Sequence, residues 1–178
     1  ALVFIGCAQP PEAEKAAAKA AMDAAVAANA GKFVAADFEA AMKLWGTAEA
    51  QIGEKKYEEA KQGYINAKAA FDKAAASAVT QKKALTDEAT AAVTGLEAGW
   101  KTIETTAKDL ESKIADKKEA WDADTKAFAD GLKAAKDLIA KDPVAAKAKT
   151  VELKAIIDKW DAAFKEAAAA PAPKKGKK

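Results

Sequence analysis

The residues of this chain that are able to do chemistry are few, and the most distinctive is its single cysteine, Cys7. It follows an apolar run at residues 2–5 and the small residue Gly6, and it precedes Pro10 and Pro11. A lone thiol forms no internal disulfide framework, but its thiolate is a nucleophile that can acquire a covalent group. The spacing of small, apolar and proline residues around Cys7 is the most specific pattern in the sequence.

The segment resembles the lipobox of bacterial lipoproteins, in which a small residue precedes a cysteine that receives a diacylglyceryl thioether. Gly6 fits that pattern, whereas Phe4 stands where leucine is usual. The resemblance implies that residues 1–6 are the end of a signal peptide and that residues 7–12 form a lipidated tether to a membrane. Ala8, in place of aspartate, implies an outer-membrane location. The alternative is an apolar segment packed on the body, with Cys7 as a small hydrophobic residue.

Other reactive side chains are scarce. The chain has no histidine, and all 29 of its basic residues are lysine. The usual general base, the commonest metal ligand and the bidentate arginine fork are therefore missing. The carboxylates lie closest together at Glu58 with Glu59 and at Asp122 with Asp124, and we expect these residues to lie on solvated helix faces. We expect no enzyme activity, no metal site, no cofactor apart from lipid on Cys7, and no nucleic-acid binding at a formal charge of +2.

The elements that must position these residues are helices. Alanine supplies 52 of the 178 residues, together with lysine, glutamate and aspartate, which is the composition of long helices and coiled coils. No stretch alternates apolar and polar residues with a period of two. The sequence predicts an all-α fold: an elongated, coiled-coil-like helical bundle in which a helical hairpin is followed by long helices.

Residues 13–80 are predicted to form three helices. The first runs from Pro11 to about Ala30, and the second begins with Asp37 as its cap and ends near Gly53. A turn follows, and the third helix repeats apolar residues at spacings of three and four: Tyr57, Ala60, Tyr64, Ala67, Phe71, Ala74 and Ala78. The second helix is expected to bury a stripe made of Phe38, Met42, Trp45, Ala48 and Ile52.

The second and third helices together resemble a tetratricopeptide hairpin. The step from Tyr57 through Ala60 and Tyr64 to Ala67 matches the second helix of that motif, although no further unit follows at a 34-residue period. With Cys7, the hairpin resembles an alanine-rich lipoprotein family of Gram-negative bacteria whose domain has no known function. That resemblance implies a place in the cell envelope and implies no activity.

Residues 81–169 are predicted to form a long-helix, coiled-coil segment. A helix restart is expected at residues 86–88, followed by a stripe with heptad spacing from Leu96 to Leu138. Lys117 and Asp124 occupy core positions of that stripe, which indicates a bend, a turn or a polar layer. Residues 88–141 therefore form either one long helix or a hairpin. Pro143 begins the last helix, whose apolar residues are Val151, Ile156, Ile157, Trp160 and Phe164.

Four tryptophans fall on the apolar stripes of four different stretches, Trp45, Trp100, Trp121 and Trp160. Such positions favour burial in the core. The alternative is that one or two of them face outward and contact a partner, because tryptophan is enriched at binding hot spots.

Residues 170–178 are predicted to be a disordered tail with four lysines, Lys174, Lys175, Lys177 and Lys178. The tail is a flexible end, contacts anionic lipid or peptidoglycan, or carries a covalent peptidoglycan link at Lys178, as its likeness to the major murein lipoprotein implies. We expect a non-enzymatic, membrane-anchored scaffold or spacer that binds a protein partner or itself. The alternative is an accessory subunit that docks onto a membrane complex or filament.

Overall fold

The computed structural model describes residues 9–169, of which 91% are helical. The predicted all-α class is confirmed. The chain divides into two compact units, unit 1 from Ala1 to Lys83 and unit 2 from Ala84 to Lys178. The longest helix, α4 (Tyr57–Asp109), contributes residues to both units.

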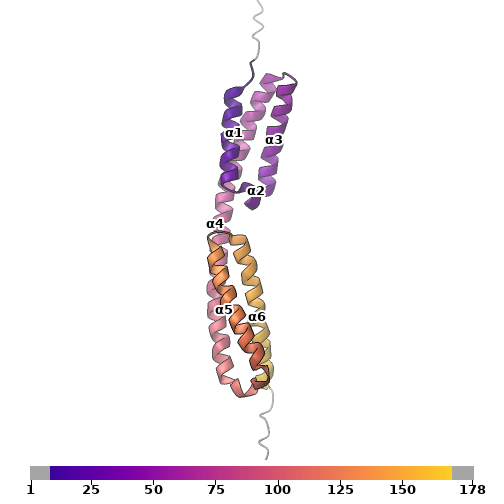
Figure 1. Ribbon diagram of the computed structural model, residues 1–178. Helices are drawn as coiled ribbons and strands as arrows, with labels where there is room; N and C mark the ends of the chain where they lie inside the picture. Colours follow the sequence, from indigo (N-terminus) through magenta and orange to yellow (C-terminus); the bar gives the residue numbers. More distant parts are fainter. Residues whose placement is uncertain (1–8, 170–178) are drawn as a thin grey trace, which may run out of the picture. The chain divides into compact units, whose positions relative to one another are not determined.

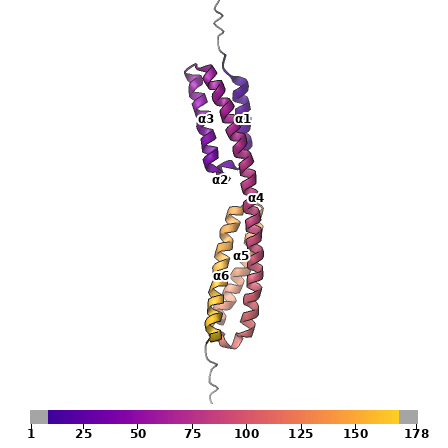
Figure 2. The same ribbon diagram turned by 180° about the vertical axis from the view of Figure 1, so that it is seen from behind.

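Unit 1 contains α1 (Glu12–Ala27), the single turn α2 (Ala30–Phe33), α3 (Ala35–Gly53) and the first part of α4. In both views α1, α3 and this part of α4 lie side by side (Figures 1 and 2). Its core consists mainly of alanines with two large rings, those of Tyr64 and Phe71. Small side chains let the helix backbones approach closely. A methyl group added to Gly63 of α4 would lie 2.9 Å from the Cβ of Ala48 of α3.

The first two helix boundaries of unit 1 differ from the prediction. Helix α1 ends at Ala27, and Asn29 adopts the left-handed conformation with φ of 58°, which asparagine tolerates better than most residues. The chain then makes the extra turn α2. Helix α3 begins at Ala35 with Val34 as its N-cap residue, and it has no side-chain cap. Asp37 lies inside its first turn, where a carboxylate favours the helix dipole without capping it.

Two predicted reversals are confirmed. Helix α3 ends at Gly53 and α4 begins at Tyr57, with Lys55 left-handed in the turn at φ of 59°. Helix α6 (Pro143–Ala169) begins at the predicted proline, and Asp142 Oδ1 accepts a hydrogen bond from Ala145 N at 3.1 Å. Both reversals carry local signals, a glycine in the first and an aspartate cap with a first-turn proline in the second.

The predicted helix restart at residues 86–88 is wrong, because α4 continues through these residues without interruption. No glycine or proline lies between Ala74 and Val93 to end it, and Ala89 is fully buried. Without a residue that ends it, the helix runs on from Tyr57 to Asp109.

Unit 2 contains the second part of α4, α5 (Lys118–Ile139) and α6, which lie side by side in both views (Figures 1 and 2). Helix α4 ends at Asp109, and two 3-10 turns, η1 (Glu111–Lys113) and η2 (Ala115–Lys117), reverse the chain into α5. Residues 88–141 are therefore a hairpin and not one long helix. Lys117 lies in the turn, whereas Asp124 lies within α5.

Two predicted core residues lie on the surface. Val151 of α6 is 67% exposed and Met42 of α3 is 42% exposed. Thr150 and Ala41, which directly precede them in the sequence, are buried. In each case the helix is rotated so that the residue before the expected one faces the core.

Candidate functional site

An aromatic cluster dominates the core of unit 2. The ring of Trp100 stacks on Phe128 with centroids 4.2 Å apart and on Trp121 at 5.4 Å. Trp121 meets Trp160 edge to face at 4.9 Å, and Trp160 contacts Phe164 at 5.5 Å. Offset stacks and edge-to-face pairs are the favourable geometries for aromatic rings. Three of the four predicted tryptophans therefore meet in one cluster drawn from three helices.

The polar edges of two of these rings have carboxylate partners. Trp100 Nε1 donates to Glu104 Oε1 at 3.0 Å, and Trp160 Nε1 donates to Asp124 Oδ2 at 2.8 Å. Asp124 also pairs with Lys159 at 2.6 Å. Burial by itself would raise the pKa of Asp124, but the hydrogen bonds from Lys159 and Trp160 outweigh it and hold that pKa below its usual value.

A cavity of about 420 Å³ lies where α4 turns back into α5, and we call it the turn cavity. Its floor is formed by buried or half-buried residues, Glu104, Ala107, Ile114, Trp121 and Thr125. Its rim is formed by exposed residues, Lys108, Glu111, Ala115, Lys118 and Asp122. The turn cavity thus combines an aromatic ring, aliphatic carbon and charges of both signs.

Thr125 is unusual among the floor residues. Its hydroxyl oxygen is buried and has no hydrogen-bond partner within residues 9–169. Threonines elsewhere in the helices, such as Thr90, Thr94 and Thr105, donate to the carbonyl four residues earlier. A buried hydroxyl without a partner costs free energy, so Thr125 is an unsatisfied polar residue in the wall of the turn cavity.

A second polar cluster lies in unit 1. The hydroxyl of the fully buried Tyr64 donates to Glu49 Oε1 at 2.7 Å, and Lys15 lies 2.9 Å from the same carboxylate oxygen. Burial, followed by the hydrogen bond to Glu49, raises the pKa of Tyr64 well above its usual value. Burial by itself would raise the pKa of Glu49, but the hydrogen bonds from Tyr64 and Lys15 outweigh it and lower that pKa. The cluster joins α1, α3 and α4 and has a structural role.

The remaining predicted site residues are placed as follows. Trp100 and Trp160 are buried, whereas Trp45 and Trp121 are half-buried and keep part of their rings accessible. Cys7 and the four tail lysines lie outside the described residues. Within residues 9–169, no group of three His, Cys, Asp or Glu side chains is arranged to hold a metal ion.

Sequence reasoning missed the turn cavity. Glu104, Trp121 and Thr125 come together only because the chain reverses after Asp109, and no glycine or proline marks that reversal. The heptad position of Lys117 was its one signal in the sequence.

Comparison with protein-family models, curated proteins and solved structures finds no match for this chain. None of the helices in residues 9–169 is long and apolar enough to cross a membrane. The chain is an all-helical protein for which no family is identified.

Proposed function

We propose that this protein is a non-enzymatic lipoprotein of the bacterial cell envelope, anchored through Cys7, whose helical body serves as a scaffold or spacer. The alanine-rich composition, the lipobox-like residues before Cys7 and the tetratricopeptide-like hairpin of α3 and α4 support this proposal. A diacylglyceryl group supplies two acyl chains, which is enough for lasting attachment to the outer membrane.

The observation that carries the spacer role is that each unit closes a core of its own. The large rings of unit 2 pack on one another, and the alanines of unit 1 surround Tyr64 and Phe71. Helices packed in this way hold a fixed length, because the rise of 1.5 Å per residue makes α6 about 40 Å long. A helical body of this kind can hold the membrane anchor and a binding partner a fixed distance apart, and this role needs no reactive site.

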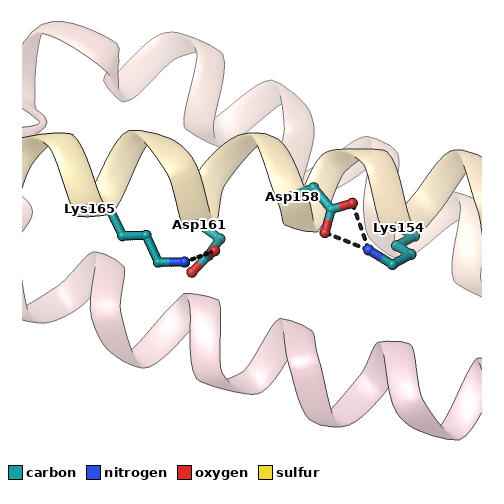
Figure 3. Close-up of polar contacts among 4 residues, drawn as sticks. All are labelled: Lys154, Asp158, Asp161 and Lys165. Carbon is teal, nitrogen blue, oxygen red and sulfur yellow. Dashed lines mark hydrogen bonds and ion pairs between the residues drawn. The ribbon is translucent and has the colours of Figure 1, made fainter.

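The outer faces of the helices support the same role. On α6, Lys154 pairs with Asp158 at 2.6 Å and Lys165 pairs with Asp161 at 2.6 Å, as Figure 3 shows. Similar pairs four residues apart occur on α4 and α5. Such exposed pairs add only about 0.3–0.5 kcal/mol each, but they keep long helices well solvated.

The proposal is tested by the intact mass of the protein isolated from its native membrane fraction. We expect loss of residues 1–6 and a gain of two or three fatty acyl groups on Cys7. The Cys7→Ser variant, expressed from the native locus, should lose the acyl mass and leave the membrane fraction. An unmodified chain that retains residues 1–6 would overturn the anchor and with it the envelope location.

The alternative is an accessory subunit that docks onto a larger membrane complex or filament, or that associates with a second copy of itself. The accessible ring surface of Trp45 and Trp121 favours this candidate. A photo-crosslinking amino acid placed at either position in living cells should then give a defined adduct. The same probe at the exposed Lys126 serves as the matched control. Adducts from Trp45 or Trp121 alone favour docking, and their absence favours the spacer.

A further inference from the structure

The floor of the turn cavity brings together two groups that suit a cation. Glu104 is half-buried, and its Oε1 accepts the indole hydrogen of Trp100 at 3.0 Å. Its other oxygen, Oε2, has no partner within residues 9–169. The half-buried ring of Trp121 lines the same cavity. A carboxylate oxygen and an aromatic ring are each attractive to an ammonium group.

The charge around the turn cavity favours a cation over an anion. Lys118 and Asp122 lie 3.1 Å apart and neutralise each other. The carboxylates of Glu104 and Glu111 then outnumber the single remaining cation, Lys108. Helix dipoles do not change this balance, because the negative end of α4 and the positive end of α5 both border the cavity.

The size and lining of the turn cavity define the rest of the ligand. A volume of about 420 Å³ is within the range of small-molecule sites. Ala107 and Ile114 add buried aliphatic surface beside the ring of Trp121. A bare metal ion would leave this surface unused, whereas an amine with an apolar body would cover it.

We propose that the turn cavity is a binding site for an organic ammonium ion that carries an apolar group. The ammonium group contacts Glu104 Oε2 and the Trp121 ring. The apolar group lies against Ala107 and Ile114. The site belongs to unit 2 alone, so this inference does not depend on a lipid anchor at Cys7.

The test is a titration of the full chain with 2-phenylethylammonium, followed by ¹H–¹⁵N NMR. We expect saturable shifts of the Trp121 indole signal and the Thr125 amide, while the Trp45 indole signal of unit 1 stays in place. Two probes of similar shape, 2-phenylethanol and 3-phenylpropanoate, separate charge from apolar contact. Equal binding of the neutral or anionic probe, or no shift at Trp121, would overturn the proposal.

Variants assign the binding to the cavity floor. Glu104→Gln keeps an acceptor for Trp100 but removes the charge, and it should weaken binding of 2-phenylethylammonium by about tenfold or more. Glu97→Gln is the matched control, because Glu97 also lies on α4 of unit 2 but pairs with Lys136 at 2.5 Å, outside the cavity. Unchanged affinity in Glu104→Gln, or an equal loss in Glu97→Gln, contradicts the assignment.

Discussion

The hydrogen bond between Trp160 and Asp124 permits a quantitative test of how unit 2 is held together. Trp160 is 1% exposed and its Nε1 donates to Asp124 Oδ2 at 2.8 Å, while Lys159 pairs with the same oxygen. Substitution Asp124→Ala removes both interactions. It leaves the indole hydrogen buried without an acceptor, which is the costly part of the change.

The expected magnitude follows from the two interactions. An unpartnered buried donor costs about 1–3 kcal/mol. The lost pair with Lys159, whose side chain is 58% exposed, adds about 0.2–1 kcal/mol. Asp124→Ala should therefore lower the free energy of unfolding by about 1–4 kcal/mol. Asp124→Asn keeps an oxygen acceptor for the indole and should cost only about 0.2–1 kcal/mol.

A double-mutant cycle isolates the hydrogen bond. In a Trp160→Phe background the indole hydrogen is absent, so Asp124→Ala should cost only the Lys159 pair. The coupling energy between residues 124 and 160 is then about 1–3 kcal/mol. The loss of ring volume in Trp160→Phe cancels in the cycle.

The assay is urea unfolding followed by the NMR intensities of backbone amides in unit 2, such as that of Phe128. This readout keeps the unfolding of unit 1 out of the measurement. If Asp124→Ala and Asp124→Asn cost the same, or if the coupling energy is near zero, the buried indole hydrogen has another acceptor and the reasoning fails.

Two further predictions concern close packing and pH. Gly63→Ala should destabilise unit 1 by about 1–3 kcal/mol in urea unfolding, because its methyl group would meet Ala48. The control Gly95→Ala has open space around it and should raise the free energy of unfolding by up to about 1 kcal/mol. A Gly63→Ala variant that is more stable would show that the helices separate freely. Because the folded pKa values of Glu49 and Asp124 are lowered, their stabilisation is present above pH about 4 and is lost as the pH falls through the folded values. As the pH is lowered, the urea midpoint should fall less steeply in the double variant Glu49→Gln, Asp124→Asn than in the unchanged protein. An equal dependence of the midpoint on pH in both proteins would contradict this.

The helical character of the chain and two of its reversals could be predicted because their causes are local. Alanine and lysine favour helix at every position, and alternating charges along the helices match the ion pairs seen on α4, α5 and α6. The reversal at Gly53 and the one at Pro143 each have residues that end or begin a helix within a few positions. Such signals act through the backbone of the same few residues, so no tertiary contact is needed to read them.

The reversal after Asp109 was decided by tertiary structure. No breaker residue lies there, but Ile114 turns inward to 5% exposure, and Lys113 Nζ donates to the carbonyl of Ala167 at 3.1 Å, near the C-terminal end of α6. Folding back lets α4 and α5 bury their apolar stripes against each other and against α6. That gain in buried surface is shared by residues far apart in the sequence, so it outweighs the local preference to continue the helix.

The burial of the tryptophans is also determined partly by the sequence and partly by tertiary packing. The spacing of Trp45, Trp100, Trp121 and Trp160 places each on an apolar stripe, which the sequence determines by itself. How deeply each ring is covered depends on the rotation and crossing of neighbouring helices, which buried Trp100 and Trp160 and left Trp45 and Trp121 partly accessible. The turn cavity has the same origin, because periodicity sets which face of a helix is apolar and only packing decides what meets it.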